Sequence, residues 1–111
     1  MGLIVYEKPA CTTCRNLAML LQEQGIAFET VEYHVTGLDD TEIRDLLAKA
    51  GIAAAEALRM REPGARDLAD ADEDTIIAAM VERPELLQRP FVLNGDRAVL
   101  ARPVERALEV I

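Results

Sequence analysis

Short apolar runs alternate along this chain with longer segments in which apolar residues recur every three or four positions. The first run, residues 3–6, is rich in β-branched side chains and predicts a buried strand. Good helix formers follow from Arg15 and predict a helix that Gly25 ends. Residues 27–33 alternate between apolar and polar and predict a second strand. A strand, a helix and a strand in this order predict a right-handed parallel pair.

The next part of the chain predicts a helical insertion. Asp39 precedes Glu42 by three positions, the spacing of a capping box. The residues after it have the spacing of an amphipathic helix, with apolar positions at Ile43, Leu46, Leu47 and Ala50. We expect short helical turns between 51 and 70. A further helix is expected to start at 72–74 and to end before Pro84, with an apolar face formed by Ile76, Ile77, Met80 and Val81.

The last quarter of the chain predicts a β-hairpin and a closing helix. Residues 89–93 and 97–103 flank Asn94-Gly95-Asp96, and the Asn-Gly pair is typical of hairpin turns. Pro103 suits the first position of a helix, because its missing N–H has no partner there in any case. The apolar residues of that helix are expected to be Val104, Ala107, Leu108 and Ile111.

Two Arg-Pro dipeptides bracket the hairpin, and the loop length decides whether their arginines face each other. A loop of two residues or of four pairs Arg89 directly with Arg102, whereas a loop of three shifts the pairing by one. Like charges directly opposite each other on neighbouring strands are destabilising unless an opposite charge answers them. Two interpretations stay open at this point: a bound oxyanion lies between the arginines, or their long side chains splay into water.

The segment Cys11-Thr12-Thr13-Cys14 stands where the first strand passes into the first helix. Backbone N–H groups and the positive end of the helix dipole favour an anion there, and they lower a thiol pKa from about 8.5 to roughly 3.5–7.5. Cys14 lies one helical turn further on, within reach of a disulfide with Cys11. The pair therefore indicates a redox or nucleophilic site.

Two other interpretations of the cysteine pair are inert core residues and a zinc site. Zinc needs about four ligands, and the chain has two cysteines and one histidine. His34 is expected at the end of the second strand, without a catalytic role. A helix start after a Pro turn is seldom sealed from solvent, which argues against inert cysteines. No metal site is expected.

Length and charge narrow the classes of function. A chain of 111 residues is expected to form one domain over 1–111. No apolar run approaches the roughly 18 residues of a membrane span, and no signal peptide is evident. A reactive cysteine pair fits the cytoplasm better than a secreted disulfide scaffold. The net charge of −8 argues against nucleic acid and acidic membranes as partners.

The order of a β-α-β unit, helices, a hairpin and a closing helix is that of the thioredoxin fold. Four blocks of the chain also resemble the glutaredoxin-coupled arsenate reductase family, namely residues 6–16, 57–59, 88–92 and 101–103. The resemblance covers essentially the whole chain. It implies a thioredoxin-like α/β domain with a mixed sheet of about four strands flanked by helices. It also places the helical insertion between the β-α-β unit and the hairpin, and makes Pro90 the cis-proline that faces the thiol.

The resemblance implies a reaction as well. Cys11 would be the nucleophile that attacks arsenate or a similar oxyanion, which is held by three arginines: Arg59, Arg89 and Arg102. Arg15 would add positive charge near the helix start, and Cys14 is a candidate resolving thiol. Arsenite would leave after attack by a further thiol. No bound cofactor is implied; the co-substrate is a thiol reductant, either glutathione with glutaredoxin or thioredoxin.

Two departures from the best-known branch of the family keep alternatives open. That branch has a histidine shortly before the nucleophile, where this chain has Glu7, and an acidic residue there raises the thiol pKa unless it points away or pairs with Lys8. That branch also lacks a second cysteine, whereas Cys14 resembles that of the Spx redox regulators, which bind RNA polymerase. The alternatives are an Spx-like regulator and a general thiol–disulfide oxidoreductase. The three retained arginines favour the oxyanion reductase.

Overall fold

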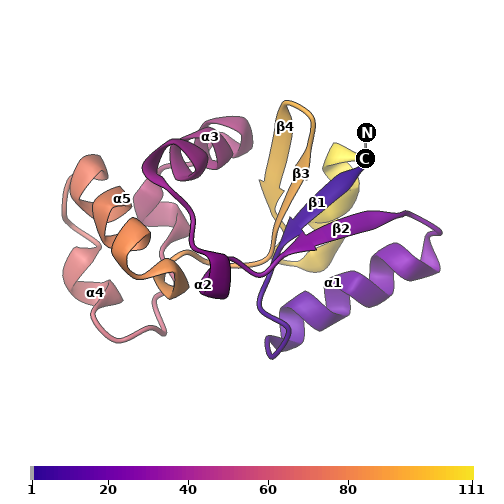
Figure 1. Cartoon of the computed structure of the whole chain (residues 1–111), viewed down its shortest axis with the longest axis horizontal. Helices are drawn as coiled ribbons and strands as arrows, with labels where there is room; N and C mark the ends of the chain where they lie inside the picture. Colours follow the sequence, from indigo (N-terminus) through magenta and orange to yellow (C-terminus); the bar gives the residue numbers. More distant parts are fainter. Residues whose placement is uncertain (1) are drawn as a thin grey trace.

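Four strands form one mixed sheet in the computed structural model, which describes residues 2–111 (Figure 1). Their order is β2-β1-β3-β4, with β1 parallel to β2 and the other neighbours antiparallel. The strands span Leu3–Tyr6 (β1), Phe28–Val31 (β2), Phe91–Asn94 (β3) and Arg97–Leu100 (β4). This sheet and its helices confirm the expected thioredoxin-like α/β class.

Each face of the sheet has its own hydrophobic core. On one face the helix α1 (Thr12–Glu23) and the C-terminal 3₁₀ helix η3 (Val104–Val110) pack on alternate strand residues such as Val5, Val92 and Val99. On the other face, Phe91 and Ala98 pack against the helical insertion. Burial of apolar side chains on both faces fixes the register of these strands, because a shift by one residue would exchange the two faces.

The helical insertion lies between β2 and β3, as the sequence predicts (Figure 1). Asp39 and Glu42 form the expected capping box: each side chain accepts a hydrogen bond from the other residue's backbone N–H, at 2.7 and 3.0 Å. Val81 is exposed, since it stands at the border of the apolar stripe rather than within it. The elements are α2 (Tyr33–Thr36), α3 (Asp40–Ala50), η1 (Ala54–Ala57), α4 (Ala65–Leu68), α5 (Glu73–Glu82) and η2 (Pro84–Leu86).

The second strand is shorter than the alternation of residues 27–33 predicts. It ends at Val31, and Tyr33 already begins α2, so His34 lies in a short helix and not at a strand end. The Tyr33 ring is fully buried in the core of the insertion, and its hydroxyl donates to the carbonyl oxygen of Leu87 at 2.5 Å. That tertiary bond draws the chain out of the sheet, a long-range effect that local alternation does not contain.

The closing helix is a 3₁₀ helix, which changes the buried face that the sequence predicts. Three residues per turn place positions 104, 107 and 110 in one row. Ala107 and Val110 are buried accordingly, whereas Leu108 and Ile111 are exposed. Pro103 precedes the helix as its cap residue and is not its first residue.

The hairpin has a two-residue loop, because Asn94 pairs with Arg97. Gly95 takes a positive φ of 65°, which the turn requires and glycine adopts without strain. Beyond the ladder, the Ala101 N–H donates to the Pro90 carbonyl at 2.9 Å, so the register continues to Pro90 and Ala101, and Arg89 and Arg102 follow directly after this pair. No helix within residues 2–111 is long and apolar enough to cross a membrane.

Candidate active site

Cys11 is the N-cap residue of α1, as the sequence predicts. Its backbone is extended, with φ −78° and ψ 124°, while its carbonyl already accepts from the Arg15 N–H at 3.0 Å. A turn closed by a bond from the Cys11 N–H to the Lys8 carbonyl brings the chain from β1 to this position. The Cys11 sulfur accepts a hydrogen bond from the Cys14 N–H at 3.4 Å, in the place of a capping oxygen.

These surroundings favour the thiolate form of Cys11. Partial burial opposes ionisation, but donation from the Cys14 N–H and the positive charge of Arg89 outweigh it, so the Cys11 pKa lies below its ordinary value. A thiolate is the nucleophilic form of cysteine, and Cys11 is only partly buried. Cys11 therefore combines ionisation with access to small molecules.

Cys14 has the opposite properties. Its side chain is buried, and burial raises its pKa to about 12, with further repulsion from Cys11 and Glu7. Both cysteines are free thiols, so the pair consists of one activated and one protonated sulfur. Glu7 thus acts on the Cys14 pKa, and Lys8 forms its ion pair with Glu85 at 3.3 Å rather than with Glu7.

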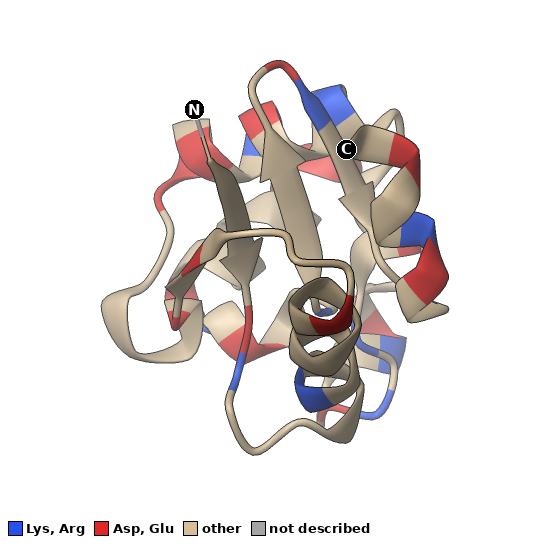
Figure 2. Cartoon of the chain, turned by 90° about the vertical axis from the view of Figure 1, so that its right-hand side faces the viewer, with Lys and Arg blue, Asp and Glu red and all other residues tan. Residues whose placement is uncertain are grey.

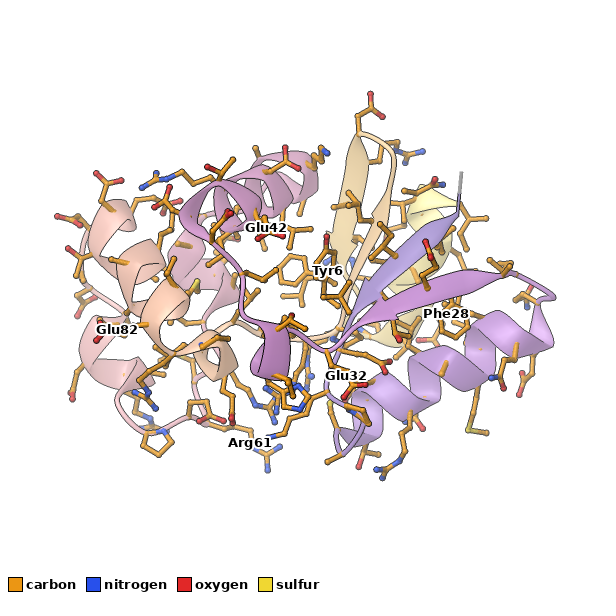
Figure 3. All side chains as sticks on the ribbon, viewed as in Figure 1. Tyr6, Phe28, Glu32, Glu42, Arg61 and Glu82 are labelled. Atoms are coloured by element: carbon orange, nitrogen blue, oxygen red, sulfur yellow. The ribbon has the colours of Figure 1, made fainter. Side chains whose placement is uncertain are left out.

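One cavity of about 260 Å³ brings Cys11 together with the arginines that the family resemblance named. Arg59, Arg89 and Arg102 all line it, although they lie in three different segments of the chain. Arg59 follows η1, Arg89 directly precedes Pro90 and β3, and Arg102 follows β4. The Arg89–Pro90 bond is cis. Lys8 and Arg61 line the same cavity, and Figure 3 places Arg61 below α2, on the loop of the helical insertion.

Arg89 is the most informative of these side chains. It is 4% exposed, and its Nε and Nη1 atoms are buried without a hydrogen-bond partner among residues 2–111. A buried donor without a partner costs about 1–3 kcal/mol, and more when it carries charge. An oxyanion in the cavity would offer acceptors for charge-assisted hydrogen bonds from this guanidinium.

The other two arginines are held by neighbours at the cavity wall. The Arg102 Nη1 donates to the Arg89 carbonyl at 2.8 Å, and the Arg59 Nη1 donates to the Gln88 Oε1 at 2.8 Å. Figure 2 shows acidic residues spread over most elements and a group of basic residues around the start of α1. The cavity is therefore a locally cationic place in a chain whose net charge is −8.

Arg15 does not line this cavity. Its guanidinium is exposed and donates to the carbonyl oxygens of Pro9 and Ala10, so it braces the turn before α1. Sequence reasoning missed Arg61 and gave Lys8 no place in the site. Arg61 stands two positions after Arg59, in a turn that the Glu62 N–H closes by donating to the Arg59 carbonyl at 2.9 Å, and no pattern in the sequence indicated that it lines the cavity. Residues 2–111 contain no cluster of side chains suited to a metal ion.

The contrast between the two sulfurs predicts selective alkylation. We expect iodoacetamide to label Cys11 far faster than Cys14 below pH 8, because only Cys11 has a lowered pKa and an accessible sulfur. The Cys11 rate should level off above its lowered pKa, while Cys14 stays protonated through this range because its pKa is about 12. Peptide mapping after a short alkylation pulse measures both rates. Faster labelling of Cys14 would contradict the assignment of the nucleophile.

Comparisons with known proteins agree over the whole fold. Residues 6–110 match the model of the ArsC family. The uncharacterized protein YfgD of Escherichia coli K12 is 37% identical over 112 residues, covering 96% of this chain and 94% of its own. An arsenate reductase of Neisseria meningitidis is 33% identical, with 96% of each chain covered. The solved arsenate reductase from Vibrio cholerae superposes with a TM-score of 0.92 at 30% identity, covering 100% and 98% of the two chains.

Proposed function

The chain belongs to the ArsC family, and we propose that it is a thiol-dependent arsenate reductase in which Cys11 attacks arsenate held by Arg59, Arg89 and Arg102. The observation that supports this assignment most strongly is the pairing, in one cavity, of an activated thiol with a buried guanidinium whose Nε and Nη1 have no hydrogen-bond partner among residues 2–111. Names of relatives suggest the substrate, and the charge and donor geometry of the cavity suit a tetrahedral oxyanion.

The first step forms a bond between sulfur and arsenic. The Cys11 thiolate donates an electron pair to arsenic, and one arsenate oxygen leaves as water after taking up protons. An anionic nucleophile and an anionic substrate repel each other, so the reaction needs positive charge close to both. The three guanidinium groups supply it, and they stabilise the charge on the arsenate oxygens as the As–S bond forms.

The second step reduces arsenic. A second thiolate attacks the Cys11 sulfur, an S–S bond forms, and the electron pair of the As–S bond stays on arsenic, which passes from As(V) to As(III). Arsenite leaves, and two thiols have become one disulfide. The balance is one arsenate and two thiols giving one arsenite, one disulfide and one water. The second thiol is either glutathione or Cys14, and the recycling reductant differs accordingly.

Burial of Cys14 predicts which reductant system still supports turnover when Cys14 is replaced. A thiol with a pKa of about 12 is a poor nucleophile near neutral pH, so glutathione should serve as second thiol when glutaredoxin recycles the protein. We expect Cys14→Ser to keep its turnover with glutathione and glutaredoxin. The same variant should lose turnover with thioredoxin, because it has no Cys11–Cys14 disulfide for thioredoxin to reduce.

The experiment measures arsenite formed from arsenate by the wild-type chain and by Cys14→Ser with each reductant system. Arsenite from the wild type in at least one system supports the proposal. Absence of arsenite in both systems, with a folded and fully reduced protein, would overturn it. A regulator that binds RNA polymerase would then be the leading alternative, and a pull-down with the oxidised and reduced forms would test it.

A further inference from the structure

We infer that Gln88 is a positioning residue of the anion site, which holds the guanidinium of Arg59 in place for the oxyanion. The inference rests on the proposed function of the cavity as an arsenate site. Gln88 is a neutral side chain next to Arg89, and it does not line the cavity itself. Its role would be to act through Arg59.

A single oxygen atom of Gln88 joins two parts of the site. Its Oε1 accepts a hydrogen bond from the Arg59 Nη1 at 2.8 Å and another from the Arg89 backbone N–H at 3.2 Å. Arg59 and Gln88 are 29 positions apart in the sequence, so this contact depends on the fold. The oxygen thereby connects the side chain of one site arginine with the backbone of another.

The backbone around Gln88 is fixed by bonds that do not involve its side chain. The Gln88 N–H donates to the Ala57 carbonyl at 2.7 Å, and the Arg59 N–H donates to the Leu86 carbonyl at 2.8 Å. Leu58 and Leu87 form an antiparallel bridge between these bonds. Loss of the side-chain amide should therefore leave the two segments in place and release only the Arg59 guanidinium.

The neutrality of Gln88 matters for binding an anion. A carboxylate at this place would hold Arg59 and also cancel part of its charge, whereas an amide oxygen orients the guanidinium and leaves its charge free. Glu62 forms an ion pair with Arg59, with its Oε1 3.9 Å from the Arg59 Nε, which is longer than a hydrogen bond, so the 2.8 Å bond to Gln88 is the contact that orients the guanidinium. The Arg59 side chain is 13% exposed, and the bond to Gln88 should reduce the entropy that Arg59 loses when the anion binds.

The same dipeptide also orients the third arginine. The Arg89 carbonyl accepts from the Arg102 Nη1 at 2.8 Å, so residues 88–89 contact or supply every arginine of the proposed anion site. Gln88 differs from Arg89 in that it has no charge to offer to the anion. Its contribution is preorganisation, which should appear in the binding of substrate more than in the chemistry of the bound complex.

The test substitutes Gln88→Met, which keeps the size of the side chain and removes the acceptor. We expect the Kd of the reduced protein for arsenate, and for unreactive sulfate, to rise about tenfold or more. The KM for arsenate should rise by a similar factor, with a smaller change in kcat. The alkylation rate of Cys11 should stay within about twofold of the wild type, since Cys14 and the Arg89 guanidinium still activate it. Gln22→Met, on the exposed side of α1, is the matched control and should change none of these values.

A double-mutant cycle separates positioning from a general loss of stability. If Gln88 acts through Arg59, the variant Gln88→Met with Arg59→Ala should bind sulfate no more weakly than Arg59→Ala alone. Additive losses, or a Gln88→Met variant that binds anions as well as the wild type, would overturn the inference while the proposed function stands. A wild-type protein that binds neither anion would overturn both. If Gln88→Met does not fold, Gln88→Asn replaces it in the cycle, because one methylene fewer withdraws the oxygen from Arg59.

Discussion

Cys11→Ser is expected to abolish arsenate reduction, with a loss on the order of 10⁴-fold or more, the scale seen when a covalent nucleophile is removed. A serine hydroxyl stays protonated at neutral pH and cannot form the disulfide that carries two electrons away from arsenic. The measurement is the rate of arsenite formation by purified protein with glutathione and glutaredoxin.

This substitution should leave the fold intact, which makes the loss interpretable. Serine is among the preferred N-cap residues, and its hydroxyl oxygen can accept the Cys14 N–H bond that the Cys11 sulfur accepts now. The melting temperature of Cys11→Ser should therefore equal or exceed that of the wild type. Cys14→Ser is the matched control under the same reductant. Turnover by Cys11→Ser above about one tenth of the wild-type rate would exclude Cys11 as the nucleophile.

Arg89→Ala is expected to lower kcat/KM for arsenate by on the order of 10²–10³-fold, the loss typical of one donor that stabilises charge in the transition state. Two effects combine, since the substitution removes a guanidinium that lines the cavity and also one of the groups that lower the Cys11 pKa. The pH profile separates them. As the Cys11 pKa rises, the thiolate fraction near neutral pH falls, so the residual rate of Arg89→Ala should increase with pH over a range where the wild type is already constant.

Two further variants test whether the effect of Arg89→Ala is specific to the guanidinium of Arg89. Arg89→Lys should recover only part of the rate, because an ammonium group cannot make two parallel hydrogen bonds to an oxyanion. Arg97→Ala is the control, since Arg97 is exposed at the start of β4 and does not line the cavity. Steady-state kinetics and the rise in melting temperature with sulfate should both be measured. Equal losses for Arg89→Ala and Arg97→Ala would mean that Arg89 has no specific role.

Local patterns predicted those elements whose stability is itself local. The capping box at Asp39 and Glu42, the N-cap position of Cys11 and the hairpin around Asn94-Gly95 depend on neighbours a few positions away, although the local pattern leaves the length of the hairpin loop open. The early end of β2 and the 3₁₀ form of the closing helix could not be predicted in this way. Tyr33 leaves the sheet because its hydroxyl bonds to Leu87, 54 positions away.

The same distinction between local and long-range causes applies to the candidate site. Cys11 and its activation by a helix start are visible in a short segment of sequence. The fold brings three arginines from separate segments of the chain to that thiol, namely Arg59, Arg89 and Arg102. Only the family resemblance named all three together. Arg15 donates to the Pro9 and Ala10 carbonyls and does not line the cavity, which no pattern of charges reveals.

We propose that Cys11, within the arginine-lined cavity, transfers two electrons to arsenate together with a second thiol. A single turnover tests it most directly, because it does not depend on which protein recycles the disulfide. Fully reduced chain is mixed with an equimolar amount of arsenate and excess glutathione, and arsenic speciation is followed together with peptide mapping of the cysteines. We expect one arsenite for each disulfide formed at Cys11, whether with glutathione or with Cys14. Arsenate recovered unchanged, with Cys11 still a free thiol in a folded protein, would contradict it.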